Sequence, residues 1–183
     1  NMEKGIETLK NGGIILYPTD TIWGLGCDAT NDEACKRLIA LKQRGAEKSF
    51  IVLVDSIQML EHYTTDFPSV CYDLIDYATK PLTIIYPSVR SLSERVKAAD
   101  GSVGIRVTND PVCVKLIRQL KKPIVSTSAN FSGEKSPTCF DDISDELKSK
   151  ADAIVKERLH AICTTPSQII KIGLDSSIRV IRK

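Results

Sequence analysis

Residues 17–28 read YPTDTIWGLGCD, and they directly follow the apolar run GIIL at residues 13–16. The apolar run predicts a buried strand, which Pro18 should end because proline has no amide hydrogen to donate to a neighbouring strand. The hydroxyl and carboxylate groups that come next would lie at the end of this strand, where α/β sheets bind ligands. Gly24 and Gly26 would let the backbone approach a bound molecule closely. A polar turn between two strands explains these residues equally well, so the segment needs support from the rest of the chain.

Composition narrows the class of protein. The chain has 183 residues and 42% hydrophobic content, which suffices to bury a core in one domain. Its 25 Lys+Arg and 23 Asp+Glu give a formal net charge of +2, which argues against a strongly basic nucleic-acid-binding protein. The six cysteines lack the spacing of a zinc site or a disulfide framework. No apolar run reaches the roughly 20 residues of a membrane span, and the N-terminus lacks a signal segment. We therefore expect a cytoplasmic protein with reduced thiols, no bound metal cluster and no membrane contact.

Strand and helix patterns follow one another irregularly along the chain. Apolar runs predict strands, and amphipathic spacing after the capping residues Asn31 and Asp110 predicts helices. Because the order is irregular, the predicted fold is a mixed α/β (α+β) domain, in which helices flank a twisted mixed β-sheet. We expect helices at 3–10, after Asn31, after Ser56, after Ser69, at 111–120 and at 141–150, and strands at 13–16, 50–54, 82–86, 103–107, 123–127, 153–155, 167–170 and 178–181.

A cluster of cations follows the second predicted helix. Lys42, Arg44 and Lys48 lie between the end of that helix and a central strand. Arginine forks and mobile lysine ammonium groups together suit a polyphosphate. The same residues could instead complement the negative end of the helix dipole and remain in solvent. The chain has no glycine-rich phosphate loop of a known type, so a nucleotide would have to be bound by other means.

Two further features carry polar groups near predicted strands. Residues 126–133 read STSANFSG and follow an apolar run, so they predict either a ligand-binding segment or a capping segment. Arg106 lies within the apolar strand 103–107, where a buried guanidinium group requires an anion. That anion could be a substrate carboxylate, or an internal acid such as Asp20 or Asp28.

Taken together, five segments resemble the YrdC/TsaC family: YPTDTIWGLG at 17–26, K-x-R-x-x-x-K at 42–48, PLT at 81–83, VGIR at 103–106 and STSAN at 126–130. Their order and spacing match from about residue 5 to the C-terminus. The resemblance implies one YrdC-like domain over residues 5–183, in the short form of the family, with a concave cationic cleft. It also implies an L-threonylcarbamoyladenylate synthase, a nucleotidyltransferase that makes threonylcarbamoyl-AMP and pyrophosphate from L-threonine, bicarbonate and ATP. The product serves the threonylcarbamoyl modification of adenosine 37 in tRNA.

The same resemblance implies roles for individual residues. The threonine pocket would be formed by Thr21, Arg106, Ser126 and Ser167. The ATP site would be formed by Arg44, Lys48, Ser102, Ser128, Asn130, Ser136 and Arg182. No side chain would act as a nucleophile, and catalysis would come from positioning and electrostatics by Lys42, Arg44 and Lys48. Mg²⁺ would share the neutralisation of the phosphate charge. Beyond the substrates, tRNA or a protein of the same pathway is a candidate partner.

Two other functions fit parts of the pattern. A non-catalytic RNA-binding protein could use the same basic mouth, although the near-neutral charge argues against it. A carbamoyl-adenylating module of the hydrogenase-maturation type would use carbamoyl phosphate in place of threonine and bicarbonate. Such modules belong to much longer chains with acylphosphatase-like and zinc-finger segments, which are not found in these 183 residues.

Overall fold

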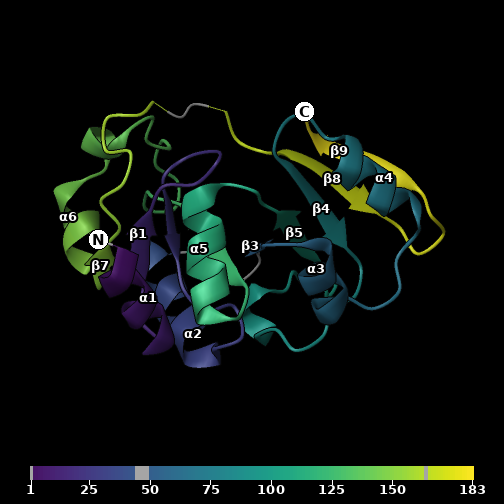
Figure 1. The fold of residues 1–183 in the computed structure, drawn as a ribbon, viewed down its shortest axis with the longest axis horizontal. Coiled ribbons are helices and arrows are strands. Elements are labelled where there is room, and N and C mark those ends of the chain that lie inside the picture. Colours follow the sequence, from purple (N-terminus) through teal and green to yellow (C-terminus); the bar gives the residue numbers. More distant parts are fainter. Residues whose placement is uncertain (1, 44–49, 163–164) are drawn as a thin grey trace.

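A computed structural model describes residues 2–43, 50–162 and 165–183 (Figure 1). Its strands form one mixed sheet in the order β7-β1-β2-β6-β3-β5-β4-β8-β9. Parallel and antiparallel neighbours alternate irregularly across this sheet, which confirms the predicted mixed fold. The strands are β1 Ile15–Tyr17, β2 Gly24–Gly26, β3 Ile51–Val54, β4 Leu82–Tyr86, β5 Val103–Val107, β6 Ile124–Ser128, β7 Ala153–Ile154, β8 Gln168–Ile172 and β9 Ile178–Arg182.

Helices gather at both ends of the sheet. Figure 1 shows α1 and α6 close to β7 near the N-terminus, whereas α3 contacts β3 and β5, and α4 lies toward β4 and β8. The α-helices are α1 Met2–Lys10, α2 Asp32–Lys42, α3 Ile57–Tyr63, α4 Val70–Tyr77, α5 Pro111–Leu120 and α6 Asp145–Lys150, and two short 3-10 helices are η1 Glu94–Val96 and η2 Phe140–Asp142.

Local capping sets the start of several helices. The Asn31 side chain accepts a hydrogen bond from the amide of Ala34, and α2 begins directly after it, as predicted. Asp110 caps α5 in the same way, with proline in the first turn. The predicted helix at 141–150 is wrong at its start. The Ser144 side chain caps α6 instead, because Phe140–Asp142 already forms a separate 3-10 turn.

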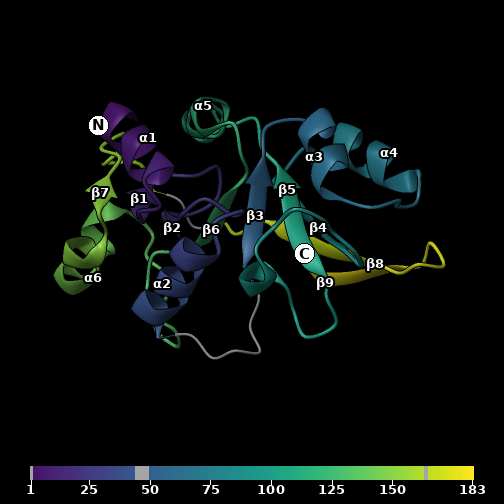
Figure 2. The same ribbon diagram turned by 90° about the horizontal axis from the view of Figure 1, so that it is seen from below.

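The hydrophobic core consists of two clusters of buried residues. One part packs α1 and α5 against the sheet, with Leu9 and Ile117 among its buried residues. The other packs α2, α3 and α4 against the sheet, with Leu38 and Leu60 among its buried residues. Figure 2 shows α5 and α2 on opposite sides of β6 and β3. The middle of the sheet is therefore held from both faces.

The glycines of β2 serve close packing between strands. A Cβ atom at Gly26 would lie 2.3 Å from the Val125 oxygen and 2.7 Å from Cε1 of Tyr17. A Cβ atom at Gly24 would lie 3.2 Å from the Thr127 oxygen. The missing side chains therefore let Gly26 lie against Tyr17 and both glycines lie against β6, while the expected approach of their backbone to a ligand stays a prediction.

The described cysteines are free, which agrees with the expected reduced thiols. Cys27, Cys35, Cys71 and Cys113 are buried. Burial raises the pKa of the Cys113 thiol, so this group stays protonated near neutral pH. Within the described ranges, no helix has the length and apolar character needed to cross a lipid bilayer.

Candidate active site

The sheet register brings two distant arginines to one face. Arg106 of β5 pairs with Thr83 of β4, Thr83 pairs with Ile169 of β8, and Ile169 pairs with Arg182 of β9. Side chains of paired residues on neighbouring strands point to the same face of a sheet. Arg106 and Arg182 therefore face the same side, although they lie far apart in the sequence.

A cavity of about 250 Å³ lies on this face. Its walls come from the turn after β1, from β3, β5 and β6, and from both ends of the β8–β9 hairpin. Apolar contacts come from Ile22, Ile51 and Pro166. The structure brings together most of the site residues implied by the resemblance, since the cavity is lined by Thr21, Arg106, Ser126, Ser128, Ser136, Ser167 and Arg182.

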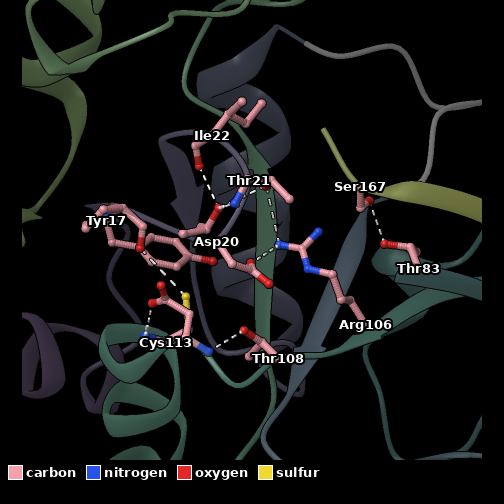
Figure 3. Close-up of polar contacts among 12 residues, drawn as sticks. Tyr17, Asp20, Thr21, Ile22, Thr83, Arg106, Thr108, Cys113 and Ser167 are labelled. Atoms are coloured by element: carbon pink, nitrogen blue, oxygen red, sulfur yellow. Dashed lines mark hydrogen bonds and ion pairs between the residues drawn. The ribbon is translucent and has the colours of Figure 1, made fainter. Parts of the chain in front are cut away.

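Arg106 is 2% exposed and already has an internal acidic partner. Its Nη2 donates to Oδ1 of Asp20 at 2.9 Å and lies 3.5 Å from Oγ1 of Thr21. In Figure 3 the guanidinium group lies between Asp20 and Thr21 on one side and Ser167 on the other. The Nε atom is buried and has no hydrogen-bond partner. Of the alternatives that the sequence left open, the internal acid Asp20 is present, and the buried Nε is left without an acceptor.

The turn between β1 and β2 is held by the hydroxyl of Thr19. The Thr19 Oγ1 atom lies 2.7 Å from the backbone oxygen of Ile22, 3.0 Å from the Thr21 amide nitrogen and 3.0 Å from Oγ1 of Thr21. Thr19 and Asp20 carry no site role in the sequence prediction, apart from Asp20 as an alternative partner of Arg106. Their position in a polar turn directly after a strand is the feature of the sequence that could have indicated a role in the site.

Arg182 and Ser167 form the opposite wall. Nε of Arg182 donates to the backbone oxygen of Ser167 at 2.8 Å, and Nη2 of Arg182 lies 3.3 Å from the hydroxyl Oγ of Ser167. The Ser167 hydroxyl in turn lies 2.8 Å from Oγ1 of Thr83. Burial, and then the nearby Arg106 charge, lower the pKa of Arg182. Two guanidinium groups that repel each other across one cavity would both be stabilised by an anion.

Three further predicted residues do not line this cavity. Ser102 donates its hydroxyl to Asp100 at 2.5 Å. Asn130 donates its amide to the oxygens of Phe131 and Glu134, at 3.0 and 2.7 Å. Lys42 is buried, and its Nζ donates to the backbone oxygen of Ser128.

The other two cations of the predicted cluster, Arg44 and Lys48, lie outside the described residues. The described part of the cavity therefore takes its positive charge from Arg106 and Arg182. The predicted polyphosphate-binding role of Arg44 and Lys48 stays a prediction.

A second cavity of about 310 Å³ has Asp20, the neighbour of Thr21, in its lining. Asp55, Lys80 and Asn109 contribute polar groups to its lining. The Asp20 carboxylate therefore lines this second cavity while its Oδ1 atom holds Arg106.

Comparison with known proteins finds relatives that agree with the family resemblance of the sequence. The Sua5/YciO/YrdC family model, described as telomere recombination, matches residues 7–183. A threonylcarbamoyl-AMP synthase of Pseudomonas aeruginosa is 37% identical over 150 residues, covering 81% of this chain and 80% of the relative. One of Vibrio vulnificus is 33% identical over 159 residues, covering 85% of each.

A solved structure agrees with the fold. The structure of P. abyssi Sua5 in complex with L-threonine has a TM-score of 0.86 at 23% identity. The match covers 99% of this chain and 53% of that one, so the chain spans about half of the Sua5 protein. The family match extends over nearly all of the chain, and the chain belongs to the Sua5/YciO/YrdC family.

Proposed function

We propose that this protein is a threonylcarbamoyl-AMP synthase, which joins L-threonine, bicarbonate and ATP and releases pyrophosphate. The observation that carries the proposal is the cavity in which Arg106 and Arg182 face a wall of hydroxyl groups. Such a site suits a small carboxylate next to a phosphate. Both anions need hydrogen-bond donors, which the lining provides, and no carboxylate side chain is part of the described lining to repel them. The names of the relatives at 33% and 37% identity support the same activity.

The two ends of the cavity would bind different substrates. Arg106, which lines the cavity, would bind the threonine carboxylate through its guanidinium group. Thr21, Ser126 and Ser167 would surround the rest of the amino acid. Arg182 would face the phosphates of ATP.

Further ATP contacts would come from hydroxyl and amide side chains near the cavity and from the cationic segment. We assign this role to Ser102, Ser128, Asn130, Ser136, Arg44 and Lys48. Lys42 would stabilise the phosphate charge electrostatically without direct contact, because its Nζ donates to the backbone oxygen of Ser128.

The reaction needs no nucleophile from the protein. The threonine amine takes up bicarbonate to give a carbamate and water, and a carbamate oxygen then attacks the α-phosphorus of ATP as pyrophosphate leaves. Holding the three reactants in attack geometry can supply roughly 7–11 kcal/mol of such a barrier. The buried hydroxyl groups and guanidinium groups would complement the charge that develops on the phosphate.

Mg²⁺ would arrive with the nucleotide. The cavity lining provides hydroxyl and guanidinium groups, and the described residues contain no cluster of three or more His, Cys, Asp or Glu side chains that could hold a metal ion. Magnesium typically keeps several waters and binds substrate phosphates, so the triphosphate would supply its main ligands. We place the reaction in the cytoplasm, as a step toward the threonylcarbamoyl modification of adenosine 37 in tRNA.

Pyrophosphate release tests this function directly. Purified protein with MgATP, L-threonine and bicarbonate should release pyrophosphate and form an adenylated product with the mass of threonylcarbamoyl-AMP. Omission of threonine or of bicarbonate should abolish product formation. ATP turnover that does not depend on threonine would contradict the proposal.

A further inference from the structure

Donor and acceptor can be assigned in only one way among the hydrogen bonds of the Thr19 hydroxyl. A hydroxyl group has one hydrogen to donate and two lone pairs that accept. The Ile22 oxygen can only accept, so the Thr19 hydrogen points to it across 2.7 Å. The Thr21 amide can only donate, so it uses one lone pair of Thr19. The remaining contact, at 3.0 Å, must then run from the Thr21 hydroxyl to the second lone pair of Thr19.

Arg106 agrees with this direction. Its Nη2 lies 3.5 Å from Oγ1 of Thr21, and a guanidinium group can only donate. Thr21 therefore gives its only hydrogen to Thr19, and its lone pairs are left for Arg106 and for a donor in the cavity that Thr21 lines. Within this site the Thr21 hydroxyl is an acceptor.

The cavity is consequently polarised. Thr21, in the turn after β1, therefore offers this cavity an acceptor, whereas Arg106 and Arg182 offer donors. An amino acid has a matching polarity, because its amino group donates and its carboxylate accepts.

We propose that Thr19 is a positioning residue, which fixes the Thr21 hydroxyl as an acceptor for the α-amino group of the substrate. The inference rests on the proposed function and specifies how the amino acid lies in the cavity. The carboxylate meets Arg106, and an amino N–H meets Thr21. Holding that N–H at Thr21 leaves the lone pair of the neutral amine free to face bicarbonate. Thr19 itself is 1% exposed and does not line the cavity, so it acts only through Thr21.

Substitution of Thr19 tests the role of its hydroxyl. Thr19→Val keeps the shape of the side chain and removes both the donor and the acceptor, so the Thr21 hydroxyl is free to turn its hydrogen toward the amine. We expect the KM for threonine to rise about tenfold, and the KM for ATP to stay within about twofold. Thr19→Ser restores the hydroxyl and should restore the KM for threonine.

Two further measurements separate this role from a loss of structure. First, calorimetric titration compares threonine with 3-hydroxybutyrate, which lacks the amino group. The wild-type protein should prefer threonine, and Thr19→Val should lose most of that preference. Second, in a Thr21→Val background, Thr19→Val should cause no additional rise in the KM for threonine, because its effect passes through the Thr21 hydroxyl. Thermal unfolding of each variant reports its folding.

Several results would overturn the inference. These are equal losses for threonine and ATP, additive effects of the two valine substitutions, an unchanged preference for threonine over 3-hydroxybutyrate, or failure of Thr19→Ser to restore the KM. The proposed function fails separately: a wild-type protein that binds threonine without releasing pyrophosphate refutes the activity, while titration still tests Thr19. A wild-type protein that does not bind threonine refutes both.

Discussion

The ammonium group of Lys42 donates a hydrogen bond to the backbone oxygen of Ser128 over 2.5 Å, and the Lys42 side chain is 1% exposed. Lys42 is the last residue of α2 and Ser128 is the last residue of β6. The contact therefore ties the end of a helix to a strand whose side chains line the cavity. Lys42 supports the wall of the site from behind.

Replacing Lys42 should destabilise the fold. Lys42→Met keeps most of the side-chain volume and removes the charged donor to Ser128, so the free energy of unfolding should fall by about 1–3 kcal/mol. Urea unfolding followed by circular dichroism measures this. Lys36→Met, at an exposed position of the same helix, is the matched control and should change stability by less than about 0.5 kcal/mol. Equal stability of the two variants would show that the buried contact contributes nothing.

Arg106 and Lys48 should affect different substrates. Arg106→Ala removes the donor proposed for the threonine carboxylate, so the affinity for threonine should fall about 10- to 100-fold while the affinity for ATP changes little. Lys48→Ala should do the reverse. Calorimetric titration of each variant with each ligand distinguishes the two effects. Equal losses for both ligands in both variants would refute the assignment.

The glycines of β2 should differ in their tolerance of a side chain. Gly26→Ala would place a Cβ atom 2.3 Å from a backbone oxygen of β6, so β2 and β6 would have to separate. We expect a loss of about 3 kcal/mol in unfolding free energy, or failure to fold. Gly24→Ala meets its nearest atom at 3.2 Å and should cost clearly less. Denaturant unfolding ranks the pair, and the opposite order would contradict the packing argument.

Asp100 should contribute to stability in a pH-dependent way. Hydrogen bonds from Lys171 and then from Ser102 hold the pKa of Asp100 well below its usual range. Because the folded-state pKa is the lower one, the ionised carboxylate stabilises the fold above the unfolded pKa of about 3.9. This stabilisation is lost as the pH falls below that value toward the folded pKa.

Comparison with Asp100→Asn isolates this contribution. The difference in unfolding free energy between wild type and Asp100→Asn should be constant from about pH 6 to 8 and should shrink below about pH 4. The Asp100–Lys171 pair is largely exposed, so added salt should reduce the difference at neutral pH. A difference that grows as the pH falls would have the wrong sign.

Local signals in the sequence predicted the start of several elements. Asn31 and Asp110 cap their helices as expected, because a cap involves only residues within one turn. Pro18 directly follows β1, because proline cannot donate to the sheet. The strand predicted at 123–127 ends one residue too early, since β6 extends through Ser128. The hydroxyl groups of residues 126–128 therefore lie within the strand and not in a segment after it.

The amino-acid sequence alone determined the fold class and the family resemblance, because both depend on residue types and their spacing, and the resemblance in turn implied most of the residues that line the cavity. Tertiary structure decided which acid neutralises Arg106, and the answer is Asp20. It also decided that Lys42 turns inward to Ser128, and that Thr19 controls the direction of the Thr21 hydroxyl. The contacts of Arg106 and Lys42 join residues far apart in the sequence, so they depend on the sheet register and on the packing of the whole domain, and the Thr19 contact depends on the exact conformation of one turn.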